Sequence, residues 1–118
     1  MGFSDSVTLQ KSFRFAVRIV RLRQHLQREH KEFDLSRQVL RSGTAVGALV
    51  REARFAQSRA DFVHKLSIAL KEANETDYWI DLLAETGYLE PRAHQSIKED
   101  IQELIRLLAA SVKTGKTE

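Results

Sequence analysis

The stretch SRQVLRSGTAVGALVREA (Ser36–Ala53) combines helical spacing of apolar residues with residues that oppose a helix. A glycine inside a helix costs about 1 kcal/mol relative to alanine, so Gly43 and Gly47 need a compensating use. Around them, apolar and small residues recur in alternating steps of four and three: Leu35, Val39, Ser42, Val46, Leu49, Ala53 and Ala56. This spacing keeps one seam on a partner helix. Because the seam continues on both sides of the glycines, we predict one unbroken helix over residues 35–56.

The two glycines stand four residues apart, beside Ala48. A phosphate-cradling loop is not indicated, since such a loop lies between a strand and a helix. We predict instead that Gly43 and Gly47 form a strip of small residues that lets another helix approach closely. Close van der Waals contact would then offset their poor helix propensity.

Three further segments have helical periodicity, over residues 6–28, 59–86 and 92–112. The segment 59–86 carries a second seam with the same steps: Phe62, Leu66, Ala69, Ala73, Thr76, Ile80 and Leu83. Asp34 and Ser58 are the expected N-caps, and Gly87 is the expected C-cap. The final residues KTGKTE are expected to fray. The boundary near residues 56–58 is the weakest and leaves open one bent helix in place of two.

Helices of this length with short connections must run antiparallel to their neighbours. We therefore predict a single all-α domain over residues 1–118, an up-down-up-down four-helix bundle. The chain has no cysteine, which excludes disulfides and thiolate-bound zinc and fits a cytoplasmic location. No apolar run approaches the roughly 18 residues that span a bilayer, so we expect no membrane partner.

Charge is divided unevenly along the chain. Residues 1–57 carry eleven Lys and Arg against five acids, whereas residues 58–118 carry eight against eleven. Two explanations fit: the halves attract one another or a neighbouring subunit, or the first half presents a basic face to a polyanion.

A stripe of basic residues follows one face of the first predicted helix, and the second helix adds to it. Arginine dominates the stripe, and its planar guanidinium suits phosphate oxygens. Aromatic residues do not interleave with the arginines, so base stacking is not indicated. We predict sequence-independent contact with RNA or DNA through Arg14, Arg18, Arg21, Arg28, Arg37 and Arg41.

The third predicted helix carries a stripe of two acids and a tryptophan, Glu72, Glu75 and Trp79. This stripe suits a general-acid pair or a partner interface. Alternatively, the acids pair with arginines of the first two helices, which is the interpretation that we prefer. Excess apolar surface on the first and third helices predicts a homo-oligomer. The interface candidates on the third helix are Ile68, Glu72, Glu75, Trp79 and Leu82.

No pattern of catalytic or metal-binding residues stands out. A di-metal bundle needs Glu-x-x-His, and the nearest approach is Asp61-x-x-His64. The histidines are scattered, and no serine sits in a nucleophile elbow. We predict a non-enzymatic protein with no metal, cofactor or small-molecule substrate. The alternative to nucleic-acid binding is a protein-binding adaptor.

Two long stretches, LSRQVLRSGTAVGALVREA and SRADFVHKLSIALKEANETDYWIDLLAETGYL, resemble the four helix bundle protein family. It is also called the 23S rRNA intervening-sequence protein family, since some members are encoded within insertions in bacterial 23S rRNA genes. The resemblance covers about residues 13–108. It implies a closed antiparallel bundle that assembles into a homo-oligomer, with five-fold rings known in the family, and no established enzymatic activity.

The chain departs from the family pattern at Leu49, where asparagine is usual. Leucine continues the seam, but whatever polar contact the asparagine makes is absent. A similar bundle is the accessory subunit of diversity-generating retroelements, in which a basic ring engages nucleic acid and a reverse transcriptase. That similarity is one of fold, and it favours nucleic acid as the partner of the arginine stripe.

Overall fold

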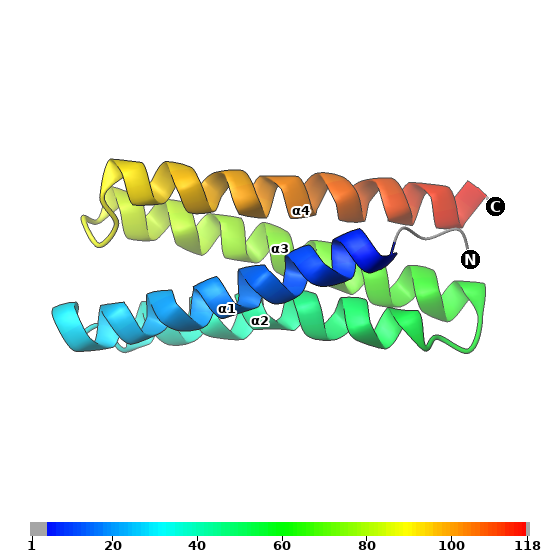
Figure 1. Ribbon diagram of the computed structural model, residues 1–118, viewed down its shortest axis with the longest axis horizontal. Helices are drawn as coiled ribbons and strands as arrows, with labels where there is room; N and C mark the ends of the chain where they lie inside the picture. Colours follow the sequence, from blue (N-terminus) through cyan, green and yellow to red (C-terminus); the bar gives the residue numbers. More distant parts are fainter. Residues whose placement is uncertain (1–4, 118) are drawn as a thin grey trace.

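The computed structural model describes residues 5–117, in which four long helices lie side by side (Figure 1). The helices are α1 (Asp5–His30), α2 (Asp34–Arg54), α3 (Arg59–Glu85) and α4 (Pro91–Thr117). Each runs antiparallel to the next, and the bundle is 46 Å long. The structure thus confirms an all-α chain of four helices packed as a bundle. Between α2 and α3 the chain turns back, so the alternative of one bent helix is wrong.

The core is built on the two predicted seams. All seven seam residues of α3 are buried, including the polar Thr76. On α2 the buried side follows Val39, Ser42, Val46 and Ala53, while Leu49 is half-buried and packs against the core. The hydroxyl groups of Thr76 and Ser42 lie 2.8 Å apart and hydrogen-bond inside this interface. Two small polar residues can therefore be buried at the α2–α3 contact without an unpaired hydroxyl.

The two glycines of α2 face α1. A Cβ atom on Gly43 would lie 2.8 Å from Cγ1 of Ile19, and one on Gly47 would lie 3.2 Å from the backbone oxygen of Ser12. Both residues are inside one continuous helix. Their missing side chains leave the room in which α1 crosses α2, so the backbones approach more closely than larger residues would allow.

The helix ends depend on local capping. Ser58 caps α3 as predicted, its Oγ accepting from the backbone N–H of Asp61 at 3.0 Å. The prediction for α2 is wrong, because Asp34 is already helical. Glu32 takes the capping role: its carboxylate accepts from three backbone N–H groups, on Asp34 (3.3 Å), Leu35 (3.1 Å) and Ser36 (2.8 Å). The negative charge of this carboxylate also interacts favourably with the positive end of the helix dipole.

The predicted fraying of the C-terminal segment is also wrong, since α4 continues to Thr117. Its last turn packs against α3: a Cβ on Gly115 would lie 2.7 Å from Cγ2 of Val63. Sequence composition suggested a loose tail, but Gly115 is buried in this contact. Tertiary packing therefore extends the helix past the segment that local propensity favours.

Helix α1 leans mainly on α2 and diverges from α4 along its length (Figure 1). Its Phe15, Ile19 and Leu26 enter the core, whereas Phe13, Val17 and Val20 stay exposed. The broad apolar side predicted for α1 is thus only partly covered within one chain. No helix within residues 5–117 has the length and apolar character of a membrane-spanning segment.

Candidate nucleic-acid interface

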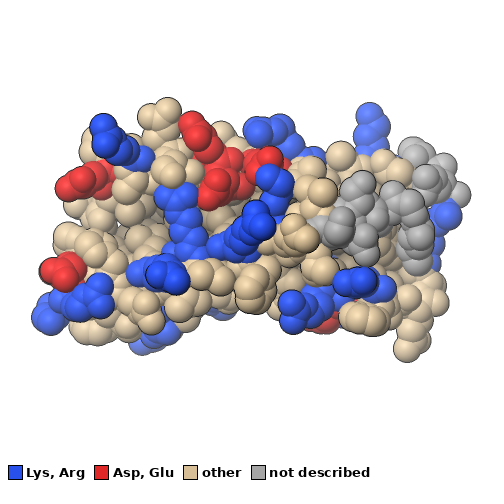
Figure 2. Space-filling model, viewed as in Figure 1, with Lys and Arg blue, Asp and Glu red and all other residues tan. Residues whose placement is uncertain are grey.

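Basic side chains lie along α1, and acidic ones gather on the neighbouring α4 (Figure 2). Helix α1 places Arg14, Arg21 and Arg28 seven residues apart on its exposed side. At 1.5 Å rise per residue, successive members of this row are about 10 Å apart. Neither Arg14 nor Arg21 has an acidic partner within residues 5–117; Arg28 contacts only its exposed neighbour Glu29, at 3.3 Å. All three guanidinium groups are therefore open to solvent anions.

Arg18 lies in the same stripe but is held by α4. Its two terminal nitrogens donate to Oδ2 of Asp100 (2.8 Å) and Oγ of Ser96 (2.9 Å). About two turns nearer the N-terminus, Nζ of Lys11 contacts Oε1 of Glu103 at 3.0 Å. The α1–α4 seam is thus bridged by ion pairs at the point where the two helices diverge.

Arg41 also forms ion pairs within the chain. One guanidinium nitrogen donates to Oε2 of Glu72 at 2.7 Å, and the other binds Oε2 of Glu75. The hydrogen bonds to Glu72 and then to Glu75 raise the pKa of Arg41 above its usual value. The indole of Trp79 donates to Glu75 at 3.0 Å; this bond, followed by the one from Arg41, lowers the pKa of the Glu75 carboxyl.

This cluster agrees with the preferred interpretation of the acid stripe on α3, in which the acids pair with an arginine of a neighbouring helix. Glu72, Glu75 and Trp79 are half-buried, as are the interface candidates Ile68 and Leu82. The stripe therefore stabilises the α2–α3 contact. It leaves little free charge for an outside partner.

Ion pairs inside the chain also account for part of the charge asymmetry. Nζ of Lys98 on α4 contacts carboxylate oxygens of Asp77 and Asp81 on α3, each at 2.7 Å. For Asp81, burial raises the carboxyl pKa, but the hydrogen bonds from Lys98 and then His94 outweigh it, so that the pKa is lowered. Acids of α3 and α4 are thus largely matched to cations of adjacent helices.

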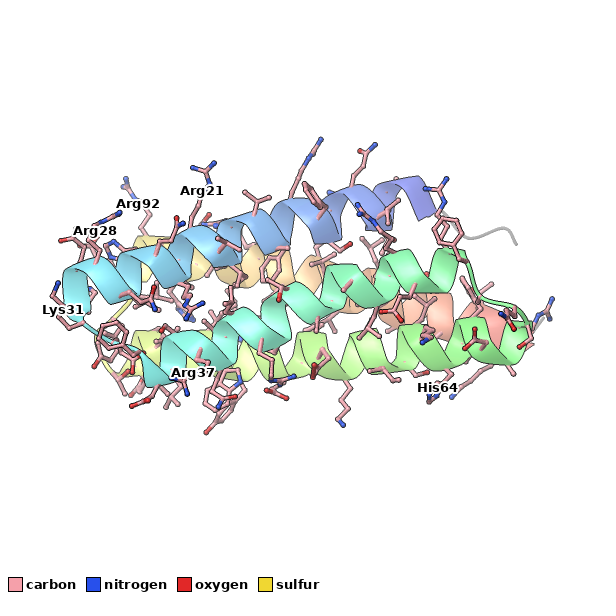
Figure 3. The ribbon with its side chains drawn as sticks, turned by 90° about the horizontal axis from the view of Figure 1, so that it is seen from below. Arg21, Arg28, Lys31, Arg37, His64 and Arg92 are labelled. Carbon is pink, nitrogen blue, oxygen red and sulfur yellow. The ribbon has the colours of Figure 1, made fainter. Side chains whose placement is uncertain are left out.

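Several exposed cations lie near one end of the bundle, where the chain turns between α1 and α2 and between α3 and α4; we call it the hairpin end. Figure 3 shows Arg21, Arg28 and Arg92 projecting on one side near this end, Lys31 at the end itself and Arg37 on the other side. Arg37, Lys31 and Arg92 have no acidic partner within the described chain; Lys31 donates only to the backbone oxygen of Arg28, at 3.3 Å.

Sequence reasoning missed Lys31 and Arg92. In an up-down-up-down bundle the first and third connections lie at the same end, so the predicted topology already placed these two cations together. The signal lay at the helix ends and not on a helix face: Lys31 stands between α1 and α2, and Arg92 is the second residue of α4.

An apolar groove lies between the first half of α1 and the second half of α2, with a volume of about 750 Å³. Phe13 and Phe55 on its walls are 57% and 76% exposed. Carbon Cζ of Arg51 lies 5.9 Å from the centre of the Phe13 ring, a cation–π contact that shields one face of the ring. Val17 and Val20 extend the apolar surface along α1. We name Phe13, Val17 and Val20 the α1 strip.

The described residues do not form a candidate metal centre. Within that part of the chain, no three His, Cys, Asp or Glu side chains are placed so as to hold a metal ion. His64 lies on α3, away from the cations at the hairpin end (Figure 3).

Comparison with known proteins places the chain in a family. No curated protein matches it. A crystal structure of a protein with unknown function from the S23 ribosomal protein family, from Bacteroides thetaiotaomicron VPI-5482, is 54% identical. The match covers 92% of this chain and 97% of that one, with a TM-score of 0.91. The model of the 23S rRNA-intervening sequence protein family matches residues 4–110, and the chain therefore belongs to that family.

Proposed function

We propose that this protein is a non-enzymatic nucleic-acid-binding bundle that contacts phosphates without reading sequence. One observation carries the proposal: after the internal ion pairs are formed, Arg14, Arg21 and Arg37 remain exposed without an acidic partner in residues 5–117. Lys31 and Arg92 extend this basic surface at the hairpin end. We call these five residues, with Arg28, the basic surface. Arg18 and Arg41 of the original six arginines are held by acids of the chain.

The arrangement of these arginines suits contact with the phosphate backbone of a nucleic acid and not with the edges of its bases. Arg14, Arg21 and Arg28 form a straight row about 21 Å long on a rigid helix, and no aromatic ring stands between them to stack on a base. Guanidinium groups in such a row can bind successive parts of a phosphate chain. The family is named after intervening sequences of 23S rRNA, which makes RNA the first polymer to test. The absence of cysteine suits the reducing cytoplasm, where we place this activity.

The test is fluorescence anisotropy with labelled RNA and DNA duplexes of mixed sequence, titrated at several salt concentrations. Each phosphate contact should contribute about −0.9 to the slope of log affinity against log salt on a duplex. The double variant Arg14→Ala/Arg21→Ala should lose about five- to tenfold in affinity, and its slope should become shallower by about two.

The control is Arg59→Ala/Lys71→Ala, which removes the same net charge from α3, a helix that does not pack on α1. Its affinity should fall much less. An equal loss in both double variants, or no detectable binding of either polymer at about 50 mM salt, contradicts the proposal.

The exposed apolar surface of α1 supports a second part of the proposal: the chain acts as a homo-oligomer, with a five-membered ring as the assembly. Phe13, Val17 and Val20 are 57%, 38% and 39% exposed and adjacent, an unusual face for an isolated soluble chain.

We expect sedimentation velocity at micromolar concentration to show an assembly larger than one chain. Phe13→Glu, which puts a charge in the middle of the α1 strip, should shift the protein toward monomer without lowering its helical content. Lys71→Glu, a new acid on the exposed side of α3, serves as the comparison for added negative charge. A monomeric wild-type protein would show this part of the proposal to be wrong.

A further inference from the structure

A small groove at the α1–α4 seam brings cations and acids together. Its volume is about 170 Å³, and its charged walls are Lys11, Arg14, Asp100 and Glu103. Arg14 has no acidic partner within the described residues, whereas Lys11 is held by Glu103 at 3.0 Å. One turn along α1 from Arg14, Arg18 is held by Asp100 at 2.8 Å. Three cations of α1 thus lie next to two carboxylates of α4 at this groove.

The geometry points to a phosphate subsite in this groove, occupied in the free protein by the carboxylates of Asp100 and Glu103. In this inference, which rests on the proposed nucleic-acid binding, α4 lowers the affinity of α1 for the polymer by competing for Lys11 and Arg18. A backbone phosphate entering beside Arg14 displaces the two carboxylates, and the released cations then bind phosphate oxygens. Asp100 and Glu103 are therefore the residues that set the affinity.

Exposure makes this exchange feasible. The side chains of Arg18 and Asp100 are 37% and 50% exposed, and those of Lys11 and Glu103 are 40% and 43% exposed. Ion pairs between groups of this kind are weak and open to water. A backbone phosphodiester carries one negative charge, as a carboxylate does, and it likewise offers a guanidinium two acceptor oxygens. Release of the counterions condensed on the polymer adds to the free energy of the exchange, so replacement of the acid by phosphate is favourable at low salt.

The pairing geometry explains why Arg18 differs from Arg14 and Arg21 on the same face. Arg18 also donates to Ser96 at 2.9 Å, so both of its terminal nitrogens are directed toward α4. With Asp100 neutralised, Ser96 still orients the guanidinium at the seam. The arginine is then prepositioned for a phosphate in the groove.

The experiment measures the affinity of the full chain for a labelled 20-base-pair duplex, as RNA and as DNA, at low salt. Asp100→Asn should raise the affinity about three- to fivefold, because it releases Arg18 as well as removing a negative charge. Its slope against log salt should steepen by about 0.9, the value for one added phosphate contact. Adding Glu103→Gln should raise the affinity and the slope again.

Glu99→Gln is the matched control. Glu99 neighbours Asp100 on α4 and is exposed, and within residues 5–117 its carboxylate accepts one hydrogen bond, from Gln95 at 3.5 Å. The control changes the net charge by the same amount at nearly the same place but releases no cation, so its gain should be smaller and its salt slope unchanged.

A double-mutant cycle makes the assignment specific. In an Arg18→Ala background, the gain from Asp100→Asn should fall to the level of Glu99→Gln, since no arginine is left to release. The inference is wrong if Asp100→Asn gains no more than Glu99→Gln, or if its full gain persists without Arg18. Thermal melts followed by circular dichroism verify that each variant is folded.

These results are separable from those that test the proposed function. One outcome is that Arg14→Ala/Arg21→Ala loses affinity while Asp100→Asn and Glu99→Gln behave alike. This outcome supports nucleic-acid binding but shows that Asp100 and Glu103 do not compete with phosphate. If only Asp100→Asn/Glu103→Gln binds, competition by these two acids is supported, and nucleic-acid binding by the wild-type protein is wrong. No binding by any of these proteins rejects both.

Discussion

Replacing Gly43 by valine should lower the free energy of unfolding by about 2 to 3 kcal/mol, the usual range for overpacking a tight core. A Cβ at this position would lie 2.8 and 3.0 Å from Cγ1 and Cγ2 of Ile19, which is itself fully buried. At Gly47 an added Cβ would lie 3.2 Å from the backbone oxygen of Ser12, so α1 and α2 are in close contact at both glycines. A side chain at residue 43 therefore forces Ile19 from its rotamer or pushes α1 away from α2.

Urea unfolding followed by circular dichroism measures this loss. Gln38→Val is the control, because it adds the same β-branched residue on an exposed position of the same helix. Gly43→Ala should lose less than Gly43→Val, since alanine gains about 1 kcal/mol in helix propensity while adding only the Cβ. If Gly43→Val is as stable as the wild type, the close approach of α1 and α2 is wrong.

Replacing Arg41 by alanine should cost about 2 kcal/mol at neutral pH, more than a surface ion pair and less than a fully buried one. The Glu72 side chain is only 12% exposed and the Glu75 side chain 32% exposed, and a single guanidinium binds both. Without it, two neighbouring carboxylates repel each other and Glu72 is left without its ionic partner. Arg37→Ala, one turn earlier on the same helix, removes an exposed arginine and should change stability by less than about 0.5 kcal/mol.

The loss in Arg41→Ala should depend on pH. The pKa of Glu75 is lower in the folded chain than its usual value of 4.5, so its contribution to stability is complete above that value. The contribution disappears as pH falls through the folded pKa, because the protonated acid no longer binds Arg41. Melting temperatures of wild type and Arg41→Ala, measured from pH 7 down to pH 3, should therefore converge in acid. A constant difference over this range would show that Arg41 acts by packing and not by charge.

Much of the fold could be predicted from the sequence because its signals are periodic. The seam from Phe62 to Leu83 appears unchanged as the buried side of α3. The unbroken seam across Gly43 and Gly47 likewise indicated a continuous helix, which the structure contains. Helix ends were less certain, since they depend on single contacts: the carboxylate of Glu32, and not Asp34, caps α2.

The candidate site was predictable only in outline. The sequence placed the arginines on helix faces, but it could not tell Arg18 and Arg41, which bind acids, from Arg14, Arg21 and Arg37, which have no acidic partner within residues 5–117. Those acids lie 82 residues from Arg18 in the sequence and 31 and 34 residues from Arg41. Local spacing carries no information about contacts over such separations.

The sequence by itself determined the four helices and the residues that form their core, because burial follows from a period that each helix repeats along its own length. Only the tertiary structure decided which charges are available to a partner. An arginine is free or bound according to the face of the neighbouring helix that reaches it, and that depends on how the helices pack. Arg18 is the decisive case, since the packing of α1 beside α4 sets it against Asp100, which lies 82 residues away in the sequence.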